Sequence, residues 1–448
     1  MKLWEKGIQV DKLIESFTIG RDNEMDMYLA PYDVLGTMAH IIMLEKAGLL
    51  TKAELASLLK ELKLIHKRIL NNGFSIEAGV EDIHSQVEFI LTEKLGDTGK
   101  KVHSGRSRND QVLVDLKLFF RAEIESLVGH IKSLFEVLQH KSEASKDMLI
   151  PGYTHLQAAM PSSFGLWYGA YAESLADDVI MLQAAWRIVN QNPLGSAAGY
   201  GSSFPLDRSL TTRLLGFETL NYNVVYAQMG RGKTERILAQ SLGSVAATLA
   251  KFAMDMCLFV NQDFNFATLP PEFTTGSSIM PHKKNPDVFE LIRGKCNRIQ
   301  GLAQEILLIN NNLPSGYFRD YQVLKEILFP AFGELKACLQ LAGMMAQGLS
   351  INKNIVDQEK YKYIFSVDEV NKLVLHGLPF RDAYRQIAGS IENGTFNPDR
   401  DIMHTHEGSI GNLCNAEIKD KMEKTIEAFH FEKVHQALEA LLNYQITA

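Results

Sequence analysis

The stretch VAATLAKFAMDMCLFV, residues 245–260, decides the fold. It belongs to a longer series in which apolar side chains recur every three or four residues, the period of an α-helix. Because these side chains spread around much of the helix, we expect it to be buried on more than one side, in a bundle or at a subunit contact. The pattern therefore predicts an oligomer. The full series is Leu238, Leu242, Val245, Leu249, Phe252, Met256 and Phe259.

Two further segments, residues 124–138 and 299–313, show the same period. Alternating strand patterns are nearly absent, and no proline occurs between Pro31 and Pro151, which favours long helices because proline ends them. Three stripes of several turns each indicate long antiparallel helices packed at shallow angles. We therefore predict an all-α fold built around a long-helix bundle.

The 448 residues are enough for two or three domains. Turn-rich segments at 151–163 and 192–205 interrupt the helices. The sequence predicts an N-terminal helical domain over residues 1–105 and a central long-helix domain over 106–355. Residues 356–448 mix shorter helical stretches with turns, and we expect them to form a separate small helical domain.

The composition is that of a soluble globular protein, with 46% hydrophobic and 22% charged residues. The net charge of −7 and the lack of a basic tract argue against a nucleic-acid partner. There is no signal-peptide pattern and no run of about 18 apolar residues, and the four cysteines have no metal-binding spacing. We expect a cytoplasmic protein without a membrane partner.

The loop TTGSSIMPHKKNP, residues 274–286, combines hydroxyl and cationic groups. Gly276 permits conformations that other residues avoid, and Pro281 and Pro286 exclude a continuous helix. The combination suits a small anion with a reactive C–H or C–N bond, whereas the spacing excludes a phosphate-binding P-loop. Taken alone, a solvated linker is the commoner explanation for such a segment.

The segment HSGRSRNDQVLVD, residues 103–115, places Arg106, Arg108 and Asn109 just before a long amphipathic stretch. Guanidinium groups bind carboxylates through two hydrogen bonds, so the segment is a candidate substrate clamp. The alternative is a helix cap with solvated arginines.

Two segments contain histidine. In EDIHSQVE, residues 81–88, metal binding is conceivable, but the spacing is not HExxH and favours a structural or supporting role. In GYTHLQ, His155 follows Thr154 in a turn and is a candidate acid or base. A lone histidine is more often structural, and a carboxylate partner such as Glu290 would strengthen the catalytic interpretation.

These motifs together resemble a known family. GSSIMPHKKNP is similar to the signature loop of the fumarase/aspartase superfamily, whose members release fumarate from succinyl-containing substrates. Within it, HSGRSRNDQV, EDIHSQVE, GYTHLQ, NPLGSAAGYG and YFRDYQVLKE together resemble the argininosuccinate lyases. The resemblance runs nearly from end to end and rests on five ordered motifs.

The resemblance implies a three-domain, mostly helical subunit and a homotetramer with a central core of about twenty long helices. It implies active sites built by three different subunits, with no cofactor and no metal. The implied reaction converts argininosuccinate reversibly to arginine and fumarate, the last step of arginine biosynthesis.

The resemblance also assigns catalytic residues. Ser277 matches the proposed base that removes a proton from the succinyl carbon. His155 matches the histidine of the acid side, with Glu290 as its carboxylate partner. Lys283 and Asn285 match residues that hold the substrate carboxylates and stabilise the carbanion.

The substrate contacts follow in the same way. Asn109 and Thr154 match substrate-binding residues, and Arg108 is the candidate clamp beside them. The residues that match those near the arginine-derived end of the substrate are Tyr317, Gln322 and Lys325.

Three positions depart from the family pattern. Asp22 stands where a substrate-contacting serine is usual, and MGRG, residues 229–232, keeps Arg231 without its two flanking acids. His282 replaces a glutamine and is shared with adenylosuccinate lyases, which makes that activity the main alternative. A catalytically silent structural protein on the same scaffold is the other alternative, and the presence of His155 and Ser277 argues against it.

Overall fold

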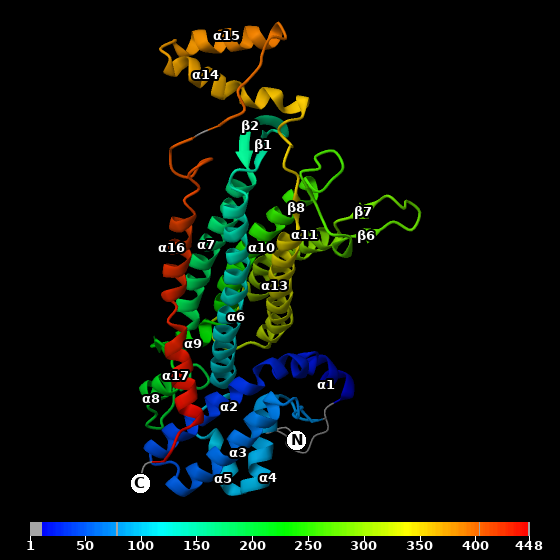
Figure 1. The fold of residues 1–448 in the computed structure, drawn as a ribbon. Helices are drawn as coiled ribbons and strands as arrows, with labels where there is room; N and C mark the ends of the chain where they lie inside the picture. Colours follow the sequence, from blue (N-terminus) through cyan, green and yellow to red (C-terminus); the bar gives the residue numbers. More distant parts are fainter. Residues whose placement is uncertain (1–10, 78, 403, 447–448) are drawn as a thin grey trace.

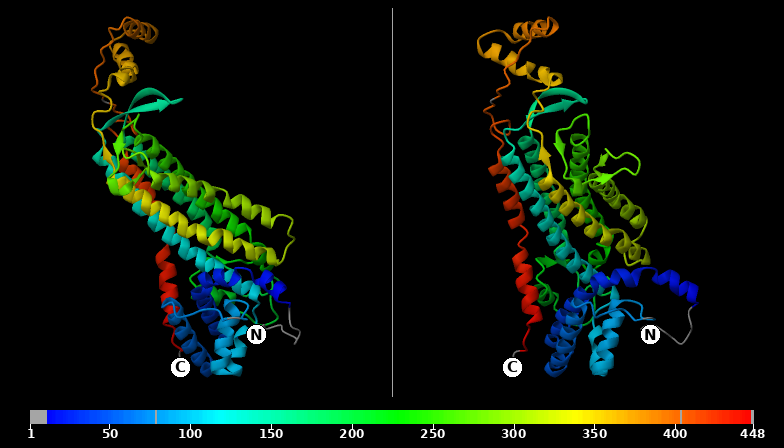
Figure 2. Two further views of the ribbon diagram at one scale, coloured as in Figure 1. Left: turned by 90° about the vertical axis from the view of Figure 1, so that its right-hand side faces the viewer. Right: turned by 45° about the vertical axis from the view of Figure 1, so that its right-hand side comes forward.

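The computed structural model describes residues 11–77, 79–402 and 404–446. Long helices lie side by side in a central bundle, and most of the remaining chain is gathered at its two ends (Figure 1). The two views in Figure 2 show the same bundle from other sides. Its helices are α6 (Arg108–Ala144), α7 (Phe164–Val189), α10 (Lys233–Phe259), α11 (Asp287–Gln300), α12 (Leu302–Asn310) and α13 (Val323–Gly348).

The stripes in α6 and α10 are confirmed as core-facing sides of helices. In α10, every member of the series from Leu238 to Met256 is buried, and its last member, Phe259, is partly buried. The other faces of α10 are not all covered, since Met254 is 42% exposed. Within one chain, α10 is therefore buried on its inner side and leaves apolar surface outside.

The stripe at 299–313 does not lie on one helix. It crosses a break at Gly301, where the backbone N–H bonds to the carbonyl of Arg298, three residues back instead of four. Glycine is a poor helix former, so the helix ends there at little cost and restarts as α12. The predicted third helix is thus α11 followed by α12, and Leu313 lies beyond both.

By length and composition alone, three helical segments are apolar enough to cross a membrane. They are α2 (Asp22–Lys46), α10 and the segment 319–348 that contains α13. In their most apolar windows, 78%, 44% and 50% of the residues are buried inside the chain, respectively. Only α2 is covered on most sides.

The N-terminal part forms a second core around α2. It contains α1 (Lys12–Ile19), α3 (Lys52–Leu70), α4 (Ile83–Leu95) and the short α5 (Asp97–Lys100). This part sits at one end of the bundle, where α2 packs against the start of α6 (Figure 1). The arrangement brings residues 22–33 and 81–84 next to the first turns of the longest helix.

The segment 151–163, expected to be a turn, is a β-hairpin. Strands β1 (Leu149–Thr154) and β2 (Gln157–Ser163) pair antiparallel and are joined by a two-residue turn. His155 and Leu156 form that turn at φ of 53° and 58°, the positive values that favour tight hairpins. Prolines and a register shift between Pro151 and Tyr153 hide the strand pattern in the sequence.

The other strand pairs in the described residues are two residues long. β6 (Thr275–Gly276) pairs antiparallel with β7 (Lys284–Asn285) and closes the loop 274–286 on itself. The remaining pairs are β3 (Gln191–Asn192) with β4 (Thr219–Leu220) and β5 (Ala267–Thr268) with β8 (Ser350–Ile351). The short helix α8 (Arg208–Leu214) packs against β3 and β4, and α9 (Val224–Met229) follows β4 and packs against α6.

The region after residue 356 does not form one separate body. Helices α14 (Ser366–Leu375) and α15 (Phe380–Glu392) stand together beyond the β1–β2 end of the bundle (Figure 1). Helix α16 (Asn415–Glu427) packs along α7, and α17 (Phe431–Leu442) reaches α2 at the opposite end. Both helices pack against the rest of the chain through buried apolar side chains such as Met422 and Leu441. The domain boundaries at 105 and 355 stay predictions.

Candidate functional site

A charged cavity of about 180 Å³ lies where the N-terminal part meets the bundle. It is lined from α2, the 81–84 segment, the start of α6 and the segment that leads into α13. The structure thus brings together residues far apart in the sequence. Among its lining residues are five of the predicted substrate contacts: Arg108, Asn109, Tyr317, Gln322 and Lys325.

A helix cap places Arg108 and Asn109 at the cavity. Ser107 and Asp110 form a capping box, in which Ser107 N donates to Asp110 Oδ1 at 2.8 Å and Asn109 N donates to Ser107 Oγ at 3.3 Å. The second oxygen of Asp110 accepts bonds from Gly195 N and Ala197 N, both at 2.9 Å. Burial raises the pKa of Asp110 to about 6. One carboxylate therefore links two of the sequence motifs.

The Arg108 side chain is held by the protein itself. Its guanidinium binds Glu81 at 3.0 Å and makes a second ion pair with Asp82. Glu81 also binds Arg319 at 3.3 Å. The acids of the EDIHSQVE motif therefore fix two arginines at the cavity wall, a supporting role of the kind that the sequence favoured.

Lys325 is buried at the cavity between two carboxylates. Its Nζ lies 2.6 Å from Asp26 Oδ1 and also pairs with Asp22. Burial alone would lower the pKa of Lys325, but the charges of Asp26 and Asp22 raise it above its ordinary value, so the side chain stays ionised. Burial, together with the charge of Asp26, raises the pKa of Asp22.

Gln322 ties the cavity to the N-terminal helix. Its side-chain nitrogen donates to the carbonyl oxygens of Thr18 at 3.1 Å and Ile19 at 2.9 Å. Tyr317 stands at the edge, with 41% of its surface exposed. The predicted residues for the arginine-derived end thus form one group within a single chain.

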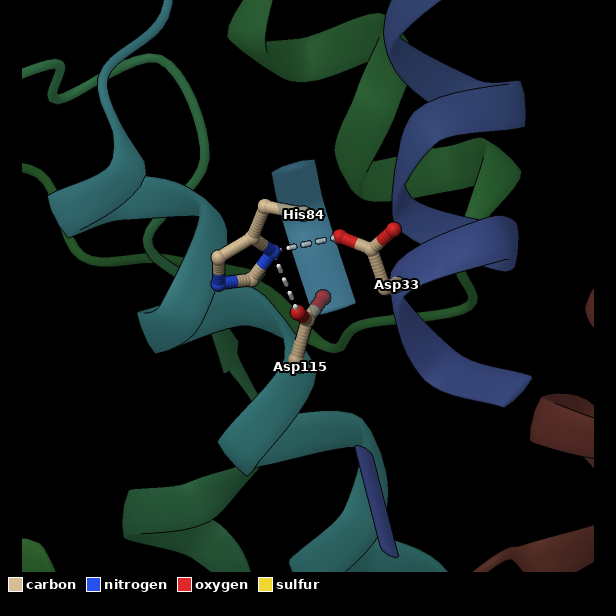
Figure 3. Close-up of side chains that lie close together, drawn as sticks. All are labelled: Asp33, His84 and Asp115. Atoms are coloured by element: carbon tan, nitrogen blue, oxygen red, sulfur yellow. Dashed lines mark hydrogen bonds and ion pairs between the residues drawn. The ribbon is translucent and has the colours of Figure 1, made fainter. Parts of the chain in front are cut away.

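At the wall of the cavity, His84 lies between Asp33 and Asp115 (Figure 3). Its Nδ1 is 2.7 Å from Asp33 Oδ1 and 3.5 Å from Asp115 Oδ2, and all three side chains are buried. Gln111 donates to the same Asp33 oxygen at 2.9 Å. Sequence reasoning did not identify Asp33 and Asp115 as partners of this histidine; carboxylates inside otherwise apolar helical stretches were the available signal.

The pKa values in this cluster shift in opposite directions. Burial alone would lower the pKa of His84, but the charge and hydrogen bond of Asp33 raise it. Burial opposes ionisation of Asp33, yet the charge of His84 and their hydrogen bond lower the pKa of Asp33. Burial and the charge of Asp33 raise the pKa of Asp115. The imidazolium of His84 therefore serves as the local counter-ion.

The same three side chains are close enough to hold a metal ion. The buried guanidinium of Arg106 also acts on Asp33 and Asp115, and its Nη1 donates to Thr37 at 3.0 Å. With His84 ionised, two cations, His84 and Arg106, already face the carboxyl groups of Asp33 and Asp115. The arrangement is an ion-pair network that supports the cavity wall, and Arg106 belongs to it instead of to a substrate clamp.

The residues predicted to protonate the leaving group lie away from the cavity. Thr154 and His155 are exposed at the β1–β2 turn, at the end of the bundle opposite the cavity (Figures 1 and 2). Glu290 is exposed in the first turn of α11. Within the described part of one chain, His155 and Glu290 make no hydrogen bond or ion pair with each other, so the predicted pair is not formed there.

The predicted base side is the loop between β6 and β7, which projects from the side of the bundle (Figure 1). Ser277 Oγ accepts a hydrogen bond from Met280 N at 3.2 Å, and Lys283 is exposed. Asn285 is half-buried at the end of the loop. One chain therefore presents three separate groups: the cavity, the hairpin turn and the loop.

Sequence comparison gives the relationship of the chain to known proteins. A family described as Lyase matches residues 5–301. The argininosuccinate lyase of Bacteroides fragilis (strain ATCC 25285) is 62% identical over 98% of this chain and 99% of the relative. The chain belongs to the argininosuccinate lyase family. The chain is accordingly a lyase, and the resemblance seen in its motifs is confirmed.

Other relatives support the same assignment. The argininosuccinate lyase of Parabacteroides distasonis is 61% identical over 99% of both chains. That of Stenotrophomonas maltophilia (strain K279a) is 38% identical over 87% of this chain and 91% of the relative. These matches favour the argininosuccinate lyases over the adenylosuccinate lyases suggested by His282.

Solved structures confirm the fold. EDDS lyase in complex with formate superposes with a TM-score of 0.74 at 23% identity, covering 97% of this chain and 94% of that one. A class II fumarase from Schistosoma mansoni gives 0.69 at 16% identity, covering 96% and 95%. The predicted all-α, fumarase/aspartase-like fold is therefore correct for the lyase.

Proposed function

We propose that this lyase converts argininosuccinate reversibly to arginine and fumarate by β-elimination, the last step of arginine biosynthesis. The observation that carries the proposal is the cavity, where Asn109, Tyr317, Gln322 and Lys325 converge. The 62% identity to a relative named argininosuccinate lyase supports the choice of substrate. The cavity would receive the arginine-derived end.

The difficult step is removal of a weakly acidic proton next to a carboxylate. In the proposed mechanism, Ser277 takes this proton from the succinyl carbon, and Lys283 and Asn285 stabilise the resulting carbanion through its carboxylate. A serine hydroxyl is hardly ionised at neutral pH, so it needs nearby positive charge and exclusion of water. The lysines of the loop supply charge, and closure of the loop over the substrate would exclude water.

The bond between the succinyl carbon and the guanidino nitrogen then breaks. His155 donates a proton to that nitrogen as it leaves, and Glu290 orients the imidazole and stabilises its ionised form. Thr154 contacts the substrate beside it. In one chain the β1–β2 turn and the start of α11 lie away from the N-terminal end of the bundle, where the cavity is (Figure 1).

We propose a homotetramer in which each active site uses three subunits. The separation of the cavity, the hairpin turn and the loop within one chain supports this assembly. Exposed apolar side chains on the four bundle helices α7, α10, α11 and α13 support it too, because water contact with such surfaces is costly. They include Met181 at 47%, Met254 at 42%, Leu291 at 62% and Met344 at 45% exposure.

We also propose that the enzyme is cytoplasmic and binds neither a membrane nor a nucleic acid. Its four cysteines are free thiols, which fits a reducing compartment. The partly covered apolar faces of α10 and α13 would be buried by other subunits instead of lipid. A net charge of −7 disfavours polyanions.

The test is fumarate release, followed by ultraviolet absorbance, from argininosuccinate and from adenylosuccinate in parallel. We expect turnover of argininosuccinate and none of adenylosuccinate. Release of fumarate from adenylosuccinate alone would contradict the proposal, and the absence of turnover with both substrates would favour a structural role.

A further inference from the structure

The cavity wall contains four carboxylates, and three of them use both oxygens inside the protein. Glu81 binds Arg319 with Oε1 and Arg108 with Oε2. Asp82 accepts Ser85 N with Oδ1 and binds Arg108 with Oδ2. These acids have no oxygen left without a partner for a ligand.

Asp26 is engaged in the same way. Its Oδ1 binds Lys325 at 2.6 Å, and its Oδ2 accepts a bond from Ile83 N at 3.3 Å. Asp22 differs from the other three, because Oδ1 pairs with Lys325 and no described residue bonds to Oδ2. Its side chain is 18% exposed, so the second oxygen is accessible from the cavity.

Lys325 provides the matching hydrogen-bond donor. An ammonium group carries three N–H donors; Lys325 donates to Asp26 and forms an ion pair with Asp22, and no other partner of its Nζ lies among the described residues. The contact pair of Asp22 and Lys325 therefore offers one free acceptor beside one free donor. An amino-acid head group, with an ammonium and a carboxylate on one carbon, complements such a pair.

Arg231 does not compete for the free oxygen. Its Nε binds Glu235 at 2.8 Å and its Nη2 donates to the carbonyl of Tyr321 at 2.9 Å. Its charge still acts on Asp22 and lowers the pKa of that carboxyl, opposing the effect of burial. The two departures from the family pattern thus meet in one cavity, where Arg231 favours the ionised form of Asp22.

We propose that Asp22 is a specificity-determining residue that binds the α-ammonium group of the substrate, while Lys325 binds the adjacent α-carboxylate. The enzyme would then select substrates with a free amino-acid end and reject those with an acylated α-nitrogen. This inference rests on the proposed function. The succinyl end must reach Ser277 and His155, which lie outside the cavity, so the amino-acid end is the one that faces Asp22.

The first experiment measures binding of three probes by calorimetry: L-arginine, Nα-acetyl-L-arginine and agmatine. Acetylation removes the cation that Asp22 would bind, whereas agmatine lacks the carboxylate for Lys325. We expect each change to weaken binding to the wild-type enzyme by about 10–100-fold, the usual value of a charged hydrogen bond. Equal affinity for arginine and its acetylated form, or no binding of arginine, would overturn the proposal.

The second experiment uses Asp22→Asn. We expect arginine to bind about 10–100-fold more weakly and the penalty for acetylation to shrink to a few-fold, because the charge that made it costly is gone. An unchanged acetylation penalty in this variant would contradict the proposal. If the variant does not fold, the probe series on the wild-type enzyme decides the question by itself.

Glu24→Gln is the matched control. Glu24 lies in the same first turn of α2, its side chain is 60% exposed, and it pairs with Arg21 outside the cavity. The variant removes the same charge from the same helix end and should bind arginine like the wild type. Equal loss in both variants would attribute the effect to the helix end and overturn the role of Asp22.

Turnover separates this inference from the proposed function. Fumarate release from argininosuccinate by the wild-type enzyme tests the function alone. If it occurs, Asp22→Asn should raise KM by about 10–100-fold and change kcat by only a few-fold, since the ammonium group is remote from the reacting bond. A fall in kcat at unchanged KM would assign Asp22 to the chemical step and contradict the proposal.

Discussion

The charged cavity and the loop 274–286 are opposite kinds of structure. In the cavity, ion pairs to buried carboxylates fix Arg108 and Lys325 before any ligand binds. In the loop, Ser277 has only backbone contacts within the loop itself, and Lys283 is exposed. Recognition groups are preorganised in one chain, whereas the surroundings of the proposed chemical groups would be supplied by substrate and by the neighbouring subunits of the proposed tetramer.

The largest expected effect tests the chemical side of this comparison. Ser277→Ala should lower kcat by about 10²–10⁴-fold or more, because it removes the proposed base. Binding of L-arginine, measured by calorimetry, should stay within a few-fold of the wild type because the cavity is untouched. Ser278→Ala, a change in the neighbouring residue, is the control and should retain turnover. Near-normal turnover in Ser277→Ala would remove Ser277 from the role of base.

Mixing variants tests whether the separated groups meet between subunits. His155→Ala and Ser277→Ala are each expected to be inactive, but each retains the group that the other lacks. After dissociation and random reassembly of equal amounts, about a quarter of the sites should contain both intact groups, the product of two even chances. The measurement is fumarate release by mixed tetramers verified by mass. Inactive mixed tetramers would contradict the shared site.

How far the sequence predicts this arrangement depends on the distance over which residues interact. The helical periods of α6 and α10 are local, so they were predicted correctly, whereas the break at Gly301 depends on a single weak helix former inside a continuous stripe. The β1–β2 hairpin was missed because proline and glycine at 151–152 are typical of turns as well as of irregular edge strands.

In the site, too, local features were predictable from the sequence and long-range contacts were not. The motif HSGRSRNDQV identified Arg108 as a candidate and the family resemblance identified Lys325, yet nothing local reveals that Lys325 pairs with Asp22 about 300 positions earlier. The partners of His84 come from two helices, α2 and α6, and are brought together only by packing. Residue types were therefore predictable, but their partners required the three-dimensional structure.

The buried cluster of His84, Asp33 and Asp115 should contribute stability that depends on pH. His84→Gln removes one partner of a buried ion pair, so we expect a loss of about 3–5 kcal/mol in the free energy of unfolding. The pKa of His84 is raised above its ordinary value of 6.5. Its contribution is thus complete below that pH and is lost as the pH rises through the folded pKa.

The measurement is denaturant unfolding of both proteins between about pH 5.5 and 9. The difference between wild type and His84→Gln should be largest at the acidic end and should shrink as the pH rises. His435→Gln is the control, since His435 is 60% exposed and pairs with Glu125 on the surface. A difference that stays constant with pH would show that His84 is not the ionised partner in this cluster.

The smallest expected effect compares two glycines, one in each region. Gly232, next to Arg231, has a φ of 73° and its missing Cβ would overlap the side chain of Asn310, so Gly232→Ala should cost about 1–2 kcal/mol. Gly276 in the loop has no such φ and nothing within 4 Å of a Cβ. Gly276→Ala should therefore leave the free energy of unfolding unchanged or raise it by up to about 1 kcal/mol. Equal losses in both variants would show that the loop is as tightly constrained as the cavity, and closure over the substrate would then need another explanation.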